Sequence, residues 1–181
     1  MYFIGGTIVE FYFSQICGII VSFFAIASMQ LKNIKKILVC QLICNGIGAL
    51  SYILVGGLSG CGIYIVALGQ TIVYFLLRQK EKKAPISVAF LFVIMYLLCS
   101  ISTYKSPNDI ISSAAALTCA LGIVQGKPTF YRAFMFANGI IWTIYDLNVG
   151  AYTMVLSHVA TALSAGIGII RFDLKIKRKY S

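Results

Sequence analysis

The feature that most constrains this chain is a succession of apolar runs, several of about 18 residues or more, separated by short polar breaks. An apolar run of that length can cross the hydrocarbon core of a bilayer as one helix. The composition agrees, because 60% of the 181 residues are hydrophobic and only 11% are charged, whereas about 25% are charged in soluble domains. The sequence therefore predicts an all-α membrane protein whose first partner is the lipid bilayer.

Seven transmembrane helices are predicted from these runs. They cover residues 11–29, 37–55, 59–77, 85–103, 110–124, 130–149 and 151–170, of which the fifth is the shortest. Pro85 suits the first turn of the fourth helix, where a missing N–H costs nothing, and Asp109 is placed to cap the fifth. Residues 1–10 include Glu10 and lack the basic segment of a signal peptide, so we expect no cleavage there.

The charges give the predicted helices a direction. All of the 15 Lys and Arg residues except Lys105 fall at one end, in alternate loops and in the tail, whereas Glu10, Asp109 and Asp146 fall at the other end. Because basic loops stay in the cytoplasm, we expect the N-terminus outside and the C-terminus inside. The net charge of +10 then reflects membrane topology, and we expect no nucleic acid among the partners.

An internal repeat joins the two ends of the chain. At a constant offset (138 − 45 = 93), the matching pairs are Asn45 with Asn138, Gly46 with Gly139, Tyr52 with Tyr145, Gly57 with Gly150, and Arg78 with Arg171. An offset of four helices preserves chain direction, so the copies are expected to be parallel, as in the 3+1+3 plan of SWEET-type transporters. The predicted organisation is one membrane unit with a first three-helix bundle at 1–78, a connector helix with its loops at 79–107, a second bundle at 108–174 and a basic tail at 175–181.

A further pattern covers the first helix and the C-terminal half. It consists of Gln15-x-x-Gly18 and an ungapped array of Arg132, Trp142, Tyr145-Asp146, Gly150 and Ile169-Ile170-Arg171-Phe172. In these residues the chain resembles the YgjV-type bacterial inner membrane proteins, a resemblance that implies location and topology but no established activity. It is similar at a distance to the SWEET, PQ-loop and nicotinamide riboside transporter group, which implies a small-solute site between two three-helix bundles. The intramembrane Pro-Gln pair of the sugar transporters is absent, so we do not expect the same hinge.

The best candidate site residues lie in the polar stretch 138–146. On a helix, Asn138, Trp142 and Tyr145 share one face. Asn138 and its match Asn45 lie near mid-membrane, where an unsatisfied amide costs several kcal/mol, so each is expected to bond either a neighbouring helix or a solute. Trp142 either stacks on a planar solute or belongs to the aromatic belt at the membrane surface.

Four other polar or aromatic residues are weaker candidates. Tyr52 and Tyr145 lie nearer the outer boundary, where a place in the aromatic belt is the favoured interpretation. His158, the only histidine, could couple transport to protons or bond a neighbouring helix. Gln70 has the same structural alternative. Asp146 is interpreted as a solvated charge at the outer mouth.

The remaining motifs are interpreted as structural. A small-residue packing face is predicted in the last helix from Ser157, Thr161, Ser164 and Gly168. The six cysteines match no zinc or redox spacing and are interpreted as packing residues. No enzyme signature is present, so we expect no catalytic residue, no cofactor and no metal site.

These observations favour a transporter that moves a small neutral or weakly polar solute by alternating access between the two bundles. The candidate substrate-binding residues are Asn45, Asn138, Trp142, Gln70, His158, Tyr52 and Tyr145. The alternatives are a membrane receptor that binds without transport and a structural membrane subunit. A second copy of the chain is a further candidate partner.

Overall fold

The computed structural model describes residues 8–54, 58–82, 84–104, 108–124, 127–149 and 152–174. These residues form seven α-helices and a terminal π-helical turn: α1 (Ile8–Met29), α2 (Ile34–Leu54), α3 (Leu58–Gln79), α4 (Ile86–Thr103), α5 (Asn108–Val124), α6 (Pro128–Val149), α7 (Tyr152–Gly168) and η1 (Ile169–Leu174). The prediction of an all-α chain is confirmed for this part of the sequence.

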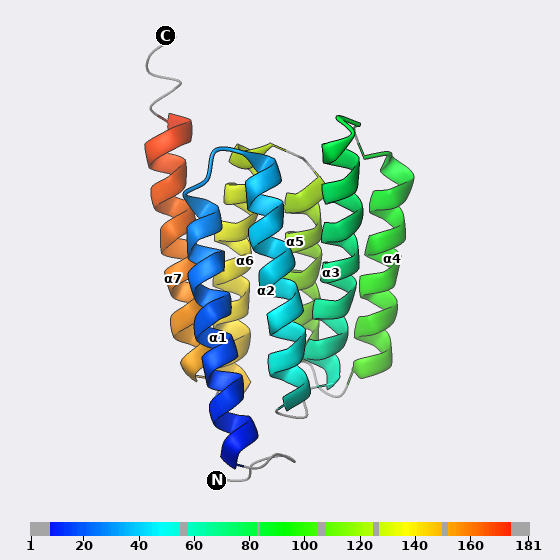
Figure 1. Cartoon of the computed structure of the whole chain (residues 1–181). Helices are drawn as coiled ribbons and strands as arrows, with labels where there is room; N and C mark the ends of the chain where they lie inside the picture. The colour runs from blue at the N-terminus through cyan, green and yellow to red at the C-terminus, as the bar shows by residue number, and fades with distance from the viewer. Residues whose placement is uncertain are drawn as a thin grey trace.

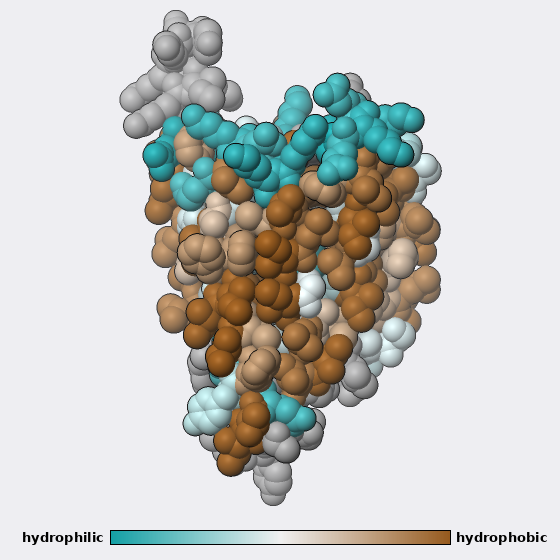
Figure 2. Space-filling model, in the orientation of Figure 1, coloured by the Kyte–Doolittle hydropathy of each residue, from teal (hydrophilic) through white to brown (hydrophobic). Residues whose placement is uncertain are grey.

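Five of the helical segments in the described residues are long and apolar enough to cross a bilayer. They are Ile8–Met29, Ile34–Leu54, Gly60–Gln79, Ile86–Thr103 and Val155–Asp173. A sixth segment, Ile110–Val124, is apolar but shorter; the fifth helix was predicted as the shortest, and α5 and α7 both have 17 residues. Most of their outward side chains are apolar and exposed, and Figure 2 shows them as a broad hydrophobic belt below a hydrophilic band.

Several helices begin a few residues from their predicted starts, and the reason can be identified for two of them. α2 begins at Ile34, not at residue 37, because Asn33 caps it by accepting a hydrogen bond from the Lys35 N–H at 2.9 Å. The basic turn was predicted as a loop because of its charge, yet it forms the first turn of the helix. Pro85 lies one position before the first turn of α4, at the N-cap, with an extended backbone. The Asp109 and Asp146 side chains lie outside the described residues.

Six helices form a closed ring. α1 packs against α2 and α7, α2 against α3, α3 against α5, α5 against α6, and α6 against α7. The seventh, α4, lies outside the ring against α3 and α5 (Figure 1). In the view of Figure 1, α1 begins at the lower end and η1 lies at the upper end. The lysines and arginines of the described residues gather at that upper end, which we call the basic end.

Large buried side chains fill the ring interior toward the basic end. This cluster, called the basic-end core, contains Met29, Ile37, Leu38, Tyr74, Phe92, Ile123, Tyr131, Met135 and Ala165. The hydroxyls of Tyr74 and Tyr131 are buried there without a hydrogen-bond partner among the described residues. Ser28 lies beside Tyr131 and donates to the Ala25 carbonyl at 2.7 Å, but no hydrogen bond joins it to the Tyr131 hydroxyl among the described residues. The basic-end core therefore closes the bundle at the cost of two unsatisfied polar groups.

Candidate functional site

The ring encloses a cavity of about 100 Å³, and all seven helices contribute to its lining. One buried water needs about 10–15 Å³, and drug-sized pockets span about 300–1,000 Å³. The cavity therefore has room for several waters or one small solute in this conformation. It is lined by Gly18, Val21, Ala25, Gln41, Cys44, Asn45, Gly48, Ser51, Tyr52, Ile63, Tyr64, Ala67, Tyr96, Ala116, Cys119, Met135, Asn138, Gly139, Trp142, Ser157, His158 and Thr161.

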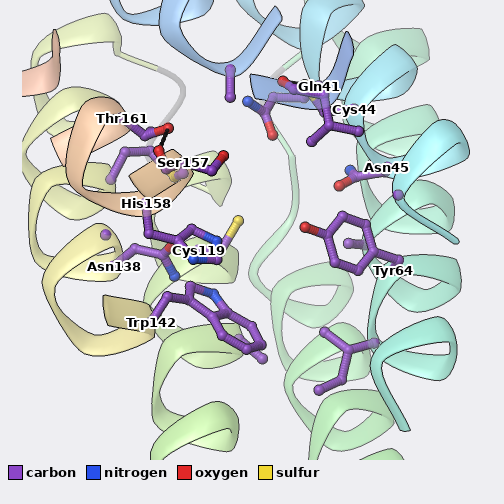
Figure 3. Close-up of a pocket in the computed structure, with 18 of the residues that line it drawn as sticks. Gln41, Cys44, Asn45, Tyr64, Cys119, Asn138, Trp142, Ser157, His158 and Thr161 are labelled. Carbon is purple, nitrogen blue, oxygen red and sulfur yellow. Dashed lines mark hydrogen bonds between the residues drawn. The ribbon is translucent and has the colours of Figure 1, made fainter. Parts of the chain in front are cut away.

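Asn45 of α2 and Asn138 of α6 both lie at the cavity wall. Asn45 donates a hydrogen bond through Nδ2 to Thr71 Oγ1 at 3.0 Å, and Asn138 donates through Nδ2 to the Ala115 carbonyl. Neither Oδ1 atom accepts a hydrogen bond from the part of the chain that the structure describes. Each amide thus bonds a neighbouring helix through its nitrogen and keeps an acceptor for the cavity (Figure 3). Gln41, one turn before Asn45 on α2, adds a third amide that sequence reasoning missed.

Trp142 lies one turn from Asn138 and is only 8% exposed. Its indole stacks on the His158 imidazole, with ring centroids 5.5 Å apart and an interplanar angle of 14°. The Tyr145 ring meets the same indole edge-on at 5.4 Å. Trp142 therefore belongs to the bundle interior and not to a lipid-facing belt. His158 joins it at the cavity wall, whereas Tyr145 packs against Trp142 and is not a lining residue.

Tyr64 of α3 faces the cavity from the opposite side (Figure 3). Its ring lies 5.4 Å from that of Tyr52, which also lines the cavity rather than an outer belt. A Cβ atom at Gly48 would collide with Tyr64, and one at Gly60 would collide with Tyr52. The two glycines therefore let α2 and α3 approach closely enough to hold both rings. The sequence pattern does not single out Tyr64, although it does include Ser157, which lies 93 residues later at the offset of the expected repeat (157 − 64 = 93).

Two serine pairs fasten α1 to its neighbours beside the cavity. The hydroxyl oxygens of Ser14 and Ser51 lie 2.8 Å apart and join α1 to α2. Those of Ser22 and Ser157 lie 2.6 Å apart and join α1 to α7. Because each hydroxyl is both donor and acceptor, such pairs satisfy polar groups between helices without placing a charge in the membrane.

The predicted small-residue face of α7 is confirmed. Ser164 accepts a hydrogen bond from Gln30 Nε2 at 3.0 Å and donates one to the Ile26 carbonyl at 3.1 Å. Gly168 touches α1 so closely that a Cβ atom would lie 2.7 Å from the Met29 carbonyl oxygen. Ser157 and Thr161 also line the cavity, which the sequence did not predict.

Gln70 lies away from the cavity, in contrast to its place among the candidates. Its side chain is fully buried, its Oε1 accepts a hydrogen bond from the Tyr96 hydroxyl at 3.1 Å, and its Nε2 donates to the Ala120 carbonyl at 3.4 Å. These bonds join α3 to α4 and α5. Gln70 is therefore a connecting residue, and Tyr96 reaches the cavity wall beside it.

The cavity lining contains no Asp, Glu, Lys or Arg. Hydroxyls, amides, aromatic rings and the thiols of Cys44 and Cys119 supply its polar groups. Within the described residues, no three His, Cys, Asp or Glu side chains converge as metal ligands would. With no carboxylate, ammonium or guanidinium group in the lining to pair with a permanent charge, the lining suits an uncharged solute.

A buried ion pair closes the ring at the basic end. Arg132, near the start of α6, bonds Asp173 of η1 through both Nη2 and Nε, at 2.8 and 3.1 Å. Its Nη1 donates to the Leu31 carbonyl, just after α1, at 2.9 Å. The two charged side chains are only 3% and 10% exposed. Arg132 thus joins α1, α6 and η1 at one point, which we call the Arg132 staple.

Comparison with known proteins assigns the sequence to a family. The family model Imp-YgjV, described as bacterial inner membrane protein, matches residues 12–176. The chain belongs to the YgjV family of bacterial inner membrane proteins. With its apolar helices, that membership makes it a multi-pass inner membrane protein in contact with the lipid bilayer. No curated protein and no solved structure matches the chain.

Proposed function

We propose that this YgjV-family protein moves a small uncharged polar solute across the inner membrane, with the central cavity as its binding site. The observation that carries the proposal is the cavity itself, enclosed by the helical ring and lined by amides and aromatic rings without a charged residue. Asn45 and Asn138 would accept hydrogen bonds from the solute. Trp142 and Tyr64 would pack against it from opposite sides.

Alternating access requires two halves that move against each other, and the proposed 3+1+3 repeat supplies them. A twofold rotation that exchanges α1, α2 and α3 with α5, α6 and α7 would also exchange the α1–α7 contact with the α3–α5 contact. Both of these helix pairs pack together. The helix order around the ring is thus compatible with a twofold axis along the membrane normal. In the proposed topology all seven helices cross the bilayer, and the basic end faces the cytoplasm.

The closed end of the cavity fits a gate. On α3 and α7 the lining residues come from the half farther from the basic end, whereas the basic-end core and the Arg132 staple fill the other end. Opening toward the cytoplasm would separate the helices that these contacts join. The buried hydroxyls of Tyr74 and Tyr131 would then meet water, so part of the cost of opening is offset by groups that are unsatisfied in the closed state.

Solute flux tests this proposal. The protein would be reconstituted in vesicles, and uptake of a panel of small neutral metabolites would be measured for wild type and for Asn138→Ala plus Trp142→Ala. We expect flux of at least one solute, reduced tenfold or more in the double variant. The matched control is Phe90→Ala plus Ser102→Ala, two exposed positions on α4, which should transport normally. Unchanged flux in the cavity variant would refute the site.

A receptor that binds without transport is the second candidate function. The small cavity and the tight staple favour it, because a closed bundle can hold a ligand without passing it on. Thermal stabilisation by a solute together with no flux of that solute would favour the receptor. Stabilisation together with flux would favour the transporter.

A further inference from the structure

Three cations gather around one aromatic ring at the basic end. Lys32 Nζ lies 5.0 Å from the centroid of the Phe172 ring, and the guanidinium carbons of Arg132 and Arg171 each lie 5.2 Å from it. A ring face attracts cations at such distances. Only Arg132 has a carboxylate partner, since Lys32 and Arg171 form no ion pair within the described residues. Two uncompensated positive charges are therefore held beside one ring.

Because each lies about 5 Å from the same centroid, the two charged groups are at most 10.2 Å apart (5.0 + 5.2), a distance at which like charges repel and a nearby anion is favoured. Lys32 and Arg171 come from segments far apart in the sequence, one just after α1 and the other in η1. Arg171 lies in the π-helical turn Ile169–Leu174. Turns of this kind are rare and occur frequently at functional sites. The pair therefore has the geometry of an anion site at the junction of two helices.

The surface of α7 that precedes Arg171 in the chain is apolar. Leu163, Ile167 and Ile170 lie on one helical face, and each is more than half exposed. Phe23 on the neighbouring helix α1 is also exposed. An occupant with a negative head and hydrocarbon chains would satisfy both parts of this surface, whereas free phosphate would satisfy only the cations.

We propose that Lys32 and Arg171 bind the phosphodiester headgroup of an anionic phospholipid whose acyl chains lie along the exposed face of α7. The site is separate from the central cavity and does not depend on transport. Phe172 holds the two cations in place, and the Arg132 staple fixes Phe172 beside them. Each basic residue near an anionic headgroup strengthens binding by about fivefold. Loss of both should therefore weaken binding by about thirtyfold.

The test measures lipid binding to the full-length protein by native mass spectrometry from detergent micelles titrated with phosphatidylglycerol. We expect Lys32→Ala plus Arg171→Ala to lower the affinity by about thirtyfold. The matched control, Lys35→Ala plus Lys36→Ala, removes the same charge from exposed positions at the same end and should lower it less than threefold. Lys32→Arg plus Arg171→Lys should bind as the wild type does, because it keeps both charges, and the alanine variant should keep the wild-type melting temperature, which shows that it is folded.

Three results would overturn the proposal. Equal losses in the two alanine variants would mean that the whole basic surface attracts the lipid and that no site exists. If phosphatidylcholine binds as tightly as phosphatidylglycerol, the negative charge of the headgroup does not determine binding. Competition by inorganic phosphate at equal concentration would assign the site to a free anion instead of a lipid.

Discussion

Removing Asp173 should destabilise the protein far more than loss of an ordinary surface charge. Asp173→Ala leaves the Arg132 guanidinium, whose side chain is 3% exposed, with the Leu31 carbonyl and the Phe172 ring as its remaining neighbours. Breaking one partner of a buried ion pair costs about 3–5 kcal/mol, whereas replacing both partners by apolar residues is often neutral. We therefore expect a loss of about 3 kcal/mol for Asp173→Ala and less than about 1 kcal/mol for Arg132→Met plus Asp173→Leu.

The assay is reversible unfolding in mixed micelles titrated with denaturing detergent, followed by circular dichroism. Thr129→Ala is the control, because it removes the exposed hydrogen bond to Asp173 at 2.8 Å and leaves the ion pair intact. It should cost about 1 kcal/mol or less. If Asp173→Ala also costs less than about 1 kcal/mol, as loss of an exposed ion pair does, the Arg132–Asp173 pair does not stabilise the contact between α1, α6 and η1. If Arg132→Met plus Asp173→Leu is as unstable as Asp173→Ala, the loss of stability does not come from an unpaired buried charge.

Two further changes test the packing. Gly139→Ala should cost about 1–3 kcal/mol, because its Cβ would lie 2.9 Å from the His158 carbonyl oxygen. Gly46→Ala, at the matching position with nothing within 4 Å, should be neutral or slightly stabilising in the same unfolding assay; equal losses would contradict the α6–α7 contact. Tyr74→Phe plus Tyr131→Phe should raise the melting temperature, since two unsatisfied hydroxyls disappear, and should slow any flux by stabilising the closed gate. A lower melting temperature would show that these hydroxyls have partners.

The residues that sequence reasoning found are those that are unusual for a membrane helix. An amide in the middle of an apolar run must have a partner, so Asn45 and Asn138 could be singled out without knowing the fold. The same holds for Trp142 and His158, although their stacking on each other could not be predicted. The number, order and approximate limits of the helices followed from the length of the apolar runs.

The residues that were missed depend on tertiary packing. Tyr64 lies in the cavity wall because Gly48 admits its ring, and tyrosine is too common in this chain to attract notice by itself. Arg132 was counted as one more basic residue at a helix start. Its partner Asp173 lies 41 residues later in the chain, in η1, and the two meet where η1 packs against α6. Gln70 was polar and intramembrane like the two asparagines, yet its bonds connect helices.

The two large rings at the cavity wall do not occupy matching positions. Trp142 corresponds to Ala49 in the first half of the chain, and Tyr64 corresponds to Ser157 in the second. Each pair thus combines one bulky and one small side chain, placed in opposite halves. If the proposed repeat relates the two halves, the rings on the cavity wall break that symmetry, because Trp142 and Tyr64 each face a smaller counterpart. The proposed solute would meet an indole on one side and a phenol on the other, so we expect the cavity to prefer one orientation of an unsymmetrical molecule over the reverse.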